Sequence, residues 1–179
     1  GVLNTTSPLT DTGNFSTSFS MLSTVFKDSD ALFNSFLANR TVLSQRLSLE
    51  KGLPNTANAA FKETGQQVLL PAFIAAYSGD KANSIGLGMF KNIPIPNWTL
   101  RYNGLMKIGW FKENFTNFTI TNGYKSSYTI SNYTNNLQYD QSDLTKVNAT
   151  GNYQPELLVT SASLIDEFSP LIKIDMKMK

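Results

Sequence analysis

Apolar and polar residues alternate along several stretches of this chain. In residues 14–22, bulky side chains occupy every second position and small polar ones lie between them. A period of two is typical of a β-strand with one apolar face. Similar stretches occur at 97–108, 115–131 and 170–179, and residues 157–165 form a mixed one. The pattern therefore predicts a mainly β fold.

Two stretches follow a helical period instead. In residues 30–48, leucines and phenylalanines recur every three or four positions, which predicts an amphipathic helix. Asp28 is placed to cap its start, and Gly52 to end it. Residues 65–77 are apolar nearly all round, but about ten such residues are too few to cross a bilayer. We expect a short helix there, buried against protein.

Charged residues are scarce, at 16% of the chain against roughly 25% in soluble domains. Asn, Ser and Thr supply the polarity instead, and a net charge of +2 gives no field suited to nucleic acid. Cysteine and histidine do not occur in the sequence. Their absence removes thiolate nucleophiles, the usual zinc sites and histidine acid–base chemistry.

Few of the remaining residues qualify as catalytic groups. Asp166-Glu167 and Lys112-Glu113 hold the obvious carboxylates, but neighbours in a strand point to opposite faces unless a bulge intervenes. Gly86-Leu87-Gly88 lacks the third glycine and the helix of a phosphate loop. Ser126-Ser127 has no histidine to activate it. We expect no enzyme activity, no catalytic residues, no cofactor and no metal site.

Alternating strands suit two kinds of fold. A strand crosses a bilayer in about 9–11 residues if one side faces lipid and the sheet closes on itself. The stretches 14–22, 97–108, 115–131 and 170–179 meet that demand. Five aromatic residues would then contribute to an interfacial girdle: Trp98, Tyr102, Tyr124, Tyr128 and Tyr133. The strands of a soluble β-sandwich also alternate, so the pattern leaves both folds open.

Two features favour the barrel. The alternation in 115–131 is long against the usual strand of about 5–6 residues. In 172–179, Ile and Met occupy one face and charged residues the other, and the stretch runs to Lys179 without a turn. An unpaired edge of this kind invites aggregation. We therefore expect the chain to continue, as part of a larger β structure.

Several segments, in order along the chain, resemble one known family. They are LFNSFLANR at 32–40, VLLPAFIAAY at 68–77, IPNW at 95–98 with YNGL at 102–105, YKSSY at 124–128 and FSPLIKIDM at 168–176. Together they resemble the SprA/Sov family, the outer-membrane translocon of the type IX secretion system of Bacteroidetes. That family also supports gliding motility.

The resemblance implies a fold for this chain. The chain would be a C-terminal fragment, an arc of a very large transmembrane β-barrel with two short inserted helices, at about 30–48 and 65–77. Residues 23–92 would form a helical insertion between strands. Residues 1–179 would be a segment of one barrel domain, with no independent domain boundary.

The resemblance also implies a function and partners. The family forms a protein-conducting pore in the cell outer membrane that passes folded cargo proteins to the cell surface, without catalytic residues or a cofactor. The expected partners are a PorV-type outer-membrane barrel protein, a periplasmic plug protein, secreted cargo proteins, the lipid bilayer and the remainder of the same barrel, but no nucleic acid.

Two other functions stay open at this point. A soluble extracellular β-rich adhesin or carbohydrate-binding module would use Trp98 and Trp110 as stacking platforms. A glycoside hydrolase would use Asp166 or Glu167, and needs two carboxylates that face each other across a cleft.

Overall fold

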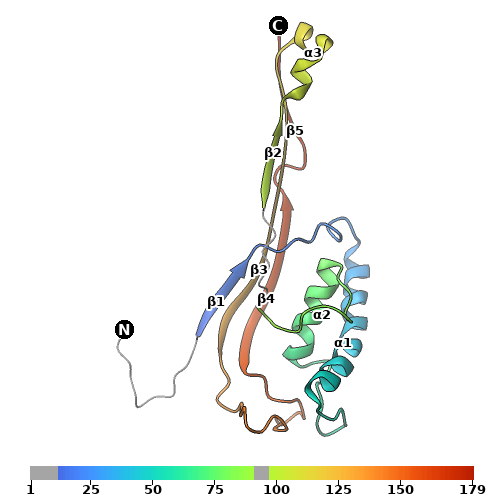
Figure 1. Cartoon of the computed structure of the whole chain (residues 1–179), viewed down its shortest axis with the longest axis vertical. Helices are drawn as coiled ribbons and strands as arrows, with labels where there is room; N and C mark the ends of the chain where they lie inside the picture. The colour runs from blue at the N-terminus through green and yellow to red at the C-terminus, as the bar shows by residue number, and fades with distance from the viewer. Residues whose placement is uncertain (1–11, 91–96) are drawn as a thin grey trace, which may run out of the picture.

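The fold is one antiparallel β-sheet accompanied by helices (Figure 1), as the alternation predicted. The computed structural model describes residues 12–90 and 97–179. Its strands are β1 (Thr12–Thr17), β2 (Trp98–Tyr102), β3 (Phe115–Asn135), β4 (Leu157–Phe168) and β5 (Lys173–Met178). Its helices are α1 (Ser29–Lys51), α2 (Gln66–Ser78), α3 (Gly109–Asn114) and the 3-10 helix η1 (Gly104–Lys107). Within the described ranges, no helix is long and apolar enough to cross a membrane.

The long strand β3 is the centre of the sheet, and each of the other strands pairs with it. β1 and β2 lie end to end along one edge of β3, while β4 and β5 lie end to end along the other. All four run antiparallel to β3. The sheet formed by the described residues is therefore a long, narrow ribbon, three strands wide, that does not close into a barrel (Figure 1).

The first edge is interrupted. β1 ends at Thr17 opposite Tyr128, and β2 begins at Trp98 opposite Tyr124. Between these two points the chain leaves the edge to form α1 and α2, and then returns to it. The two helices lie against the β4 half of the ribbon (Figure 1). The predicted insertion, 23–92, and the segment 95–98 extend partly outside the described residues.

The second edge bends between β4 and β5. The turn at Ser169-Pro170 lies against Gly123, whose N–H donates to the Pro170 carbonyl at 2.8 Å. The Ser169 N–H donates back to the Gly123 carbonyl at 2.9 Å. A Cβ at position 123 would lie 2.4 Å from the Ser169 oxygen. Gly123 is therefore needed for the close approach of the turn.

The core lies between the helices and one face of the sheet. Leu43 from α1, Val68 and Ile74 from α2, and Tyr128 and Ile130 from β3 are fully buried there. Asp28 caps α1 by accepting from the Ala31 N–H at 3.4 Å, and Gly52 ends it with a positive φ of 64°. Burial of these apolar side chains is the main force that holds the helices on the sheet.

The structure confirms both predicted helices and corrects several strands. The stretch 14–22 is extended only as far as Thr17, because Met21 turns inward and its N–H donates to the Tyr124 hydroxyl at 3.0 Å. The stretch 97–108 leaves the sheet after Tyr102, where η1 begins. The last strand begins at Lys173 rather than 170, since the turn beside Gly123 occupies the residues before it. β3 and β4 are longer than predicted.

Two buried tyrosines on the same face of β3 give a matched test of this core. Tyr124→Phe is expected to lower the free energy of unfolding by about 1–3 kcal/mol, because the buried Met21 N–H loses its acceptor. The Tyr128 hydroxyl is buried without a partner among the described residues. Tyr128→Phe is therefore expected to leave stability unchanged or to raise it by about 1 kcal/mol.

The measurement is the temperature at which half of the protein becomes susceptible to a short trypsin pulse. Equal destabilisation by the two substitutions would contradict the hydrogen-bond assignment.

Candidate functional site

Among the described residues, none packs over one half of the sheet's apolar face. Residues paired directly across an antiparallel sheet point to the same side, so Ile120 of β3 shares a face with Tyr102 of β2 and Ile174 of β5. Further members of this face are Leu100, Phe118, Met176 and Met178. Met176 is 64% exposed and Leu100 61%. We call this surface the bare band.

The bare band continues the face that the helices cover lower on the sheet. Tyr124, Tyr128 and Ile130 follow Ile120 at even positions of β3, so they lie on the same side. All three are buried, whereas Ile120 is half-buried and its partners Tyr102 and Ile174 are exposed. This face, apolar apart from Asn122 and Ser126, is thus packed in one half and largely exposed in the other.

The opposite face of the sheet is mostly polar, although Ile165 of β4, paired with Ser127, is exposed on it. Beside the bare band it carries Thr99 and Arg101 of β2, Thr121 of β3, and Lys173, Asp175 and Lys177 of β5. Lys173 and Asp175 form an ion pair at 3.0 Å. Beside the helix-covered half, the face is rich in hydroxyl groups, and the Ser16 and Thr129 hydroxyls are hydrogen-bonded at 3.0 Å. This face is suited to contact with water.

Aromatic rings gather at both ends of the bare band. At the lower end, Tyr124 packs against Trp98 at 4.7 Å and Phe168 at 5.2 Å between ring centroids. At the upper end, two rings of α3 pack against two rings at the start of β3, with neighbouring centroids between 4.9 and 5.9 Å apart: Trp110, Phe111, Phe115 and Phe118. Two residues of the predicted girdle, Tyr128 and Tyr133, instead lie in or against the core beneath the helices.

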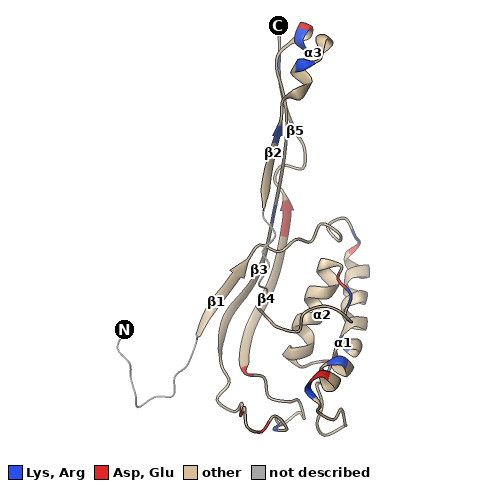
Figure 2. Ribbon diagram, in the orientation of Figure 1, with Lys and Arg blue, Asp and Glu red and all other residues tan. Residues whose placement is uncertain are grey.

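Charged groups are sparse on the strands (Figure 2). Asp166 and Glu167, at the end of β4, pair with Ser126 and Lys125 and so point to opposite faces, as the sequence predicted. Asp166 lies on the helix-covered face, and one of its carboxylate oxygens is buried without a partner among the described residues. This burial raises its pKa. The arrangement does not provide the two facing carboxylates of a glycoside hydrolase.

The other candidate groups are also dispersed. Lys112 and Glu113 are exposed on α3. Ser126 is buried and donates its N–H to Asn97 Oδ1 at 2.8 Å, while Ser127 points to the other face. Trp98 lies at one end of the bare band and Trp110 at the other, so they do not form one stacking platform. In the part of the chain that the structure describes, no group of three acidic residues is placed to hold a metal ion.

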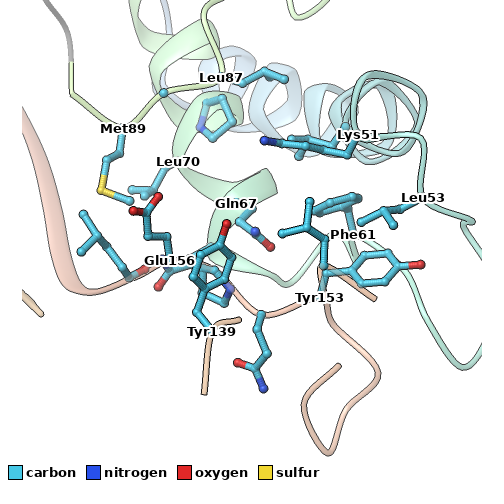
Figure 3. A pocket seen from close by; sticks show the side chains of 18 of the residues that line it. Lys51, Leu53, Phe61, Gln67, Leu70, Leu87, Met89, Tyr139, Tyr153 and Glu156 are labelled. Carbon is cyan, nitrogen blue, oxygen red and sulfur yellow. Dashed lines mark hydrogen bonds between the residues drawn. The ribbon is translucent and has the colours of Figure 1, made fainter. Parts of the chain in front are cut away.

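A cavity of about 360 Å³ lies at the other end of the helical layer (Figure 3). It is enclosed by the end of α1, the first half of α2, residues 87–90 and the loop that precedes β4. Most of its wall is apolar, including Leu47, Phe61 and Leu70. Lys51, Gln67, Tyr139 and Glu156 are also part of its wall. Gly88, from the Gly86-Leu87-Gly88 stretch, is also part of its wall.

The sequence did not indicate this cavity or the upper aromatic cluster. Phe111, Phe115 and Phe118 recur at spacings of four and three, which is a signal of a shared surface. The cavity joins residues almost ninety positions apart, such as Gln67 and Glu156, and no local pattern links them.

The partly buried Asp166 leads to a pH-dependent prediction. Its pKa is raised in the folded protein above the usual 3.8, so the folded state favours the protonated form. Stability from this group is complete below pH 3.8 and is lost as the pH rises through the folded pKa. Asp166→Asn is therefore expected to raise the unfolding temperature at pH 7 and to lose that advantage near pH 3.

The check is thermal unfolding of both proteins at the two pH values. Glu167→Gln, at the exposed neighbouring position, serves as the control and is expected to change little. An equal gain from Asp166→Asn at both pH values would show that burial of the charge is not the cause.

Comparison with known proteins gives no family assignment, since no protein-family profile matches the chain and no curated protein matches it at a significant level.

Proposed function

We propose that this chain is a wall segment of a protein-conducting pore in the outer membrane, an arc of a very large β-barrel in the type IX secretion system. The observation that carries the proposal is the bare band. It is an exposed apolar surface on one side of a long sheet, with aromatic rings at both ends and a polar surface behind it. Large exposed apolar surfaces mark contacts with membranes or with other proteins.

The height of the bare band suits a bilayer. It occupies residues 115–124 of β3, which span about 30 Å at roughly 3.3 Å per residue. Tilted strands of a membrane barrel cross the hydrocarbon in about 9–11 residues, and their apolar band is about 25 Å tall. Trp98 and Tyr124 would lie at one interface and Trp110 at the other, where aromatic residues are enriched.

The helical layer then lies outside the hydrocarbon, on the lipid-facing side of the wall. The same face of β3 that meets lipid at Ile120 is covered by protein from Tyr128 onward. The polar face, with its hydroxyl groups and alternating charges, would line a water-filled lumen that passes folded cargo proteins to the cell surface.

The two edges of the sheet call for further strands. Each edge strand of the described sheet pairs only with β3, and an open sheet edge cannot exist in hydrocarbon. The remainder of the same barrel is the partner that would satisfy these groups. In line with the resemblance to the SprA/Sov family, we further propose a PorV-type barrel and a periplasmic plug protein as partners, a role in gliding motility, and no enzymatic activity.

A neighbouring pair of residues tests which face meets lipid. Leu100 and Thr99 are both exposed, but Leu100 lies on the bare band and Thr99 on the polar face. Leu100→Lys is expected to weaken insertion into lipid vesicles by about 1–2 kcal/mol, because the ammonium enters hydrocarbon away from the bilayer centre. Ile174→Lys, nearer the middle of the band, is expected to cost about 2–4 kcal/mol.

The measurement uses the complete barrel, whose remaining strands satisfy the two edges of this segment, and records the fraction of protein that floats with the vesicles and resists a urea wash. Thr99→Lys is the matched control and is expected to insert normally. A soluble adhesin or carbohydrate-binding module would show no difference between the two faces, and that result would refute the membrane assignment.

The two tryptophans test the position of the band. In vesicles, lipids brominated near the headgroup are expected to quench Trp98 and Trp110 more than lipids brominated near the end of the acyl chain, since the proposal places both rings at interfaces. Single Trp→Phe variants separate the two signals. Trp110 is 61% exposed, which a carbohydrate-binding site would also require. Quenching by sugars, without any effect of the vesicles, would favour that alternative.

A further inference from the structure

The cavity beside the loop before β4 lies away from the bare band, at the other end of the helical layer, and Figure 3 shows the side chains that line it. Its volume of about 360 Å³ falls at the lower end of the range of ligand-binding pockets, about 300–1,000 Å³. That space is sufficient for one large side chain together with the peptide groups on either side of it. The cavity therefore has the dimensions of a small binding site.

The walls of the cavity are held in place by specific contacts. The Gln66 side chain bridges α2 and β4, accepting from the Val159 N–H at 3.1 Å and donating to the Leu157 carbonyl. The Tyr153 hydroxyl donates to the Pro54 carbonyl at 2.7 Å, and its ring packs on Phe61 at 4.8 Å. These contacts fix α2 against β4 and Tyr153 against Pro54 and Phe61, so this part of the wall is formed before any ligand enters, which reduces the cost of binding.

The lining has the chemistry of a site for an apolar group. Leu47, Leu53, Leu70 and Leu157 contribute aliphatic surface, and Phe61 contributes an aromatic ring. Removal of such surface from water favours any apolar group that fills the space. Within the described ranges, the side chains of Gln67 and Tyr139 in this wall have no hydrogen-bond partner, and those of Lys51 and Glu156 have no ion-pair partner.

These four polar side chains identify the kind of ligand. Gln67 offers one acceptor and two donors, which match the N–H and C=O of a peptide group, and the Tyr139 hydroxyl offers one of each. Lys51 and Glu156 have opposite charges, so the site has no net attraction for a simple anion or cation. A fatty acid would fill the apolar space but would leave the hydrogen-bonding groups of Gln67 without partners. A peptide satisfies the amide and does not conflict with either charge.

We propose that this cavity is a peptide-binding site, in which a segment of a partner protein inserts one aliphatic or aromatic side chain. The side chain fills the space beside Leu70, and the flanking peptide groups bond to Gln67 and Tyr139. This proposal stands on the cavity alone and does not depend on the bare band meeting lipid.

The test uses N-acetyl-4-fluorophenylalaninamide, a single aromatic side chain between two peptide groups, followed by fluorine NMR with the full protein. Binding in the millimolar range is expected to broaden the fluorine signal. Leu70→Glu, which puts a charge into the cavity, is expected to weaken binding at least tenfold. Leu49→Glu on α1, at a position 82% exposed and outside the cavity, is the matched control and is expected to bind as the parent does.

Gln67→Leu provides a second readout that does not place a charge in the protein. It is expected to weaken binding of the amide several-fold while leaving binding of fluorobenzene unchanged, because only the amide uses the lost hydrogen bonds. No broadening at 10 mM probe, or equal broadening with Leu70→Glu, would overturn the proposal. Binding of decanoate without binding of the amide probe would assign the cavity to an acyl chain instead.

Discussion

The rest of this structure depends on one constraint, the apolar face that runs the full length of β3. The strand from Phe115 to Asn135 carries many large apolar side chains on one face. Exposure of all of them to water is unfavourable, so part of this face must be buried. The lower half of this face is buried by α1 and α2, whose contact with Tyr128 and Ile130 forms the core. The upper half has no cover of its own. The division between the two halves organises everything else.

The interrupted edge explains how the helices reach their place. The chain leaves the sheet after Thr17 and resumes pairing at Trp98, only a few positions further along β3. The edge thus stays nearly continuous while a whole helical layer is added on the apolar side. Tyr124 marks the boundary, since its hydroxyl holds the Met21 backbone below and its ring packs on Trp98 above. A single residue joins the covered half to the bare half.

The two candidate surfaces follow from this arrangement and suit different partners. The bare band is extended, apolar and bounded by aromatic rings, which are features of contact with lipid. The cavity is small, and its mostly apolar wall includes Lys51, Gln67, Tyr139 and Glu156, which are features of contact with a single segment of a peptide. The helical layer separates them. We propose that the wall is anchored through the first surface and recruits a partner through the second.

Much of this arrangement follows from local sequence patterns. The alternation in 115–131 predicted β3, and helical spacing with Asp28 and Gly52 predicted α1, because periodicity and caps act over a few residues. Opposite faces for Asp166 and Glu167 followed equally from strand geometry. The early end of β1 did not, since the hydroxyl that draws Met21 inward lies more than a hundred positions away. Tertiary packing alone decided which half of the apolar face is covered. It also formed the cavity that joins Gln67 to Glu156. Alternation specifies that a face is apolar but not what lies against it.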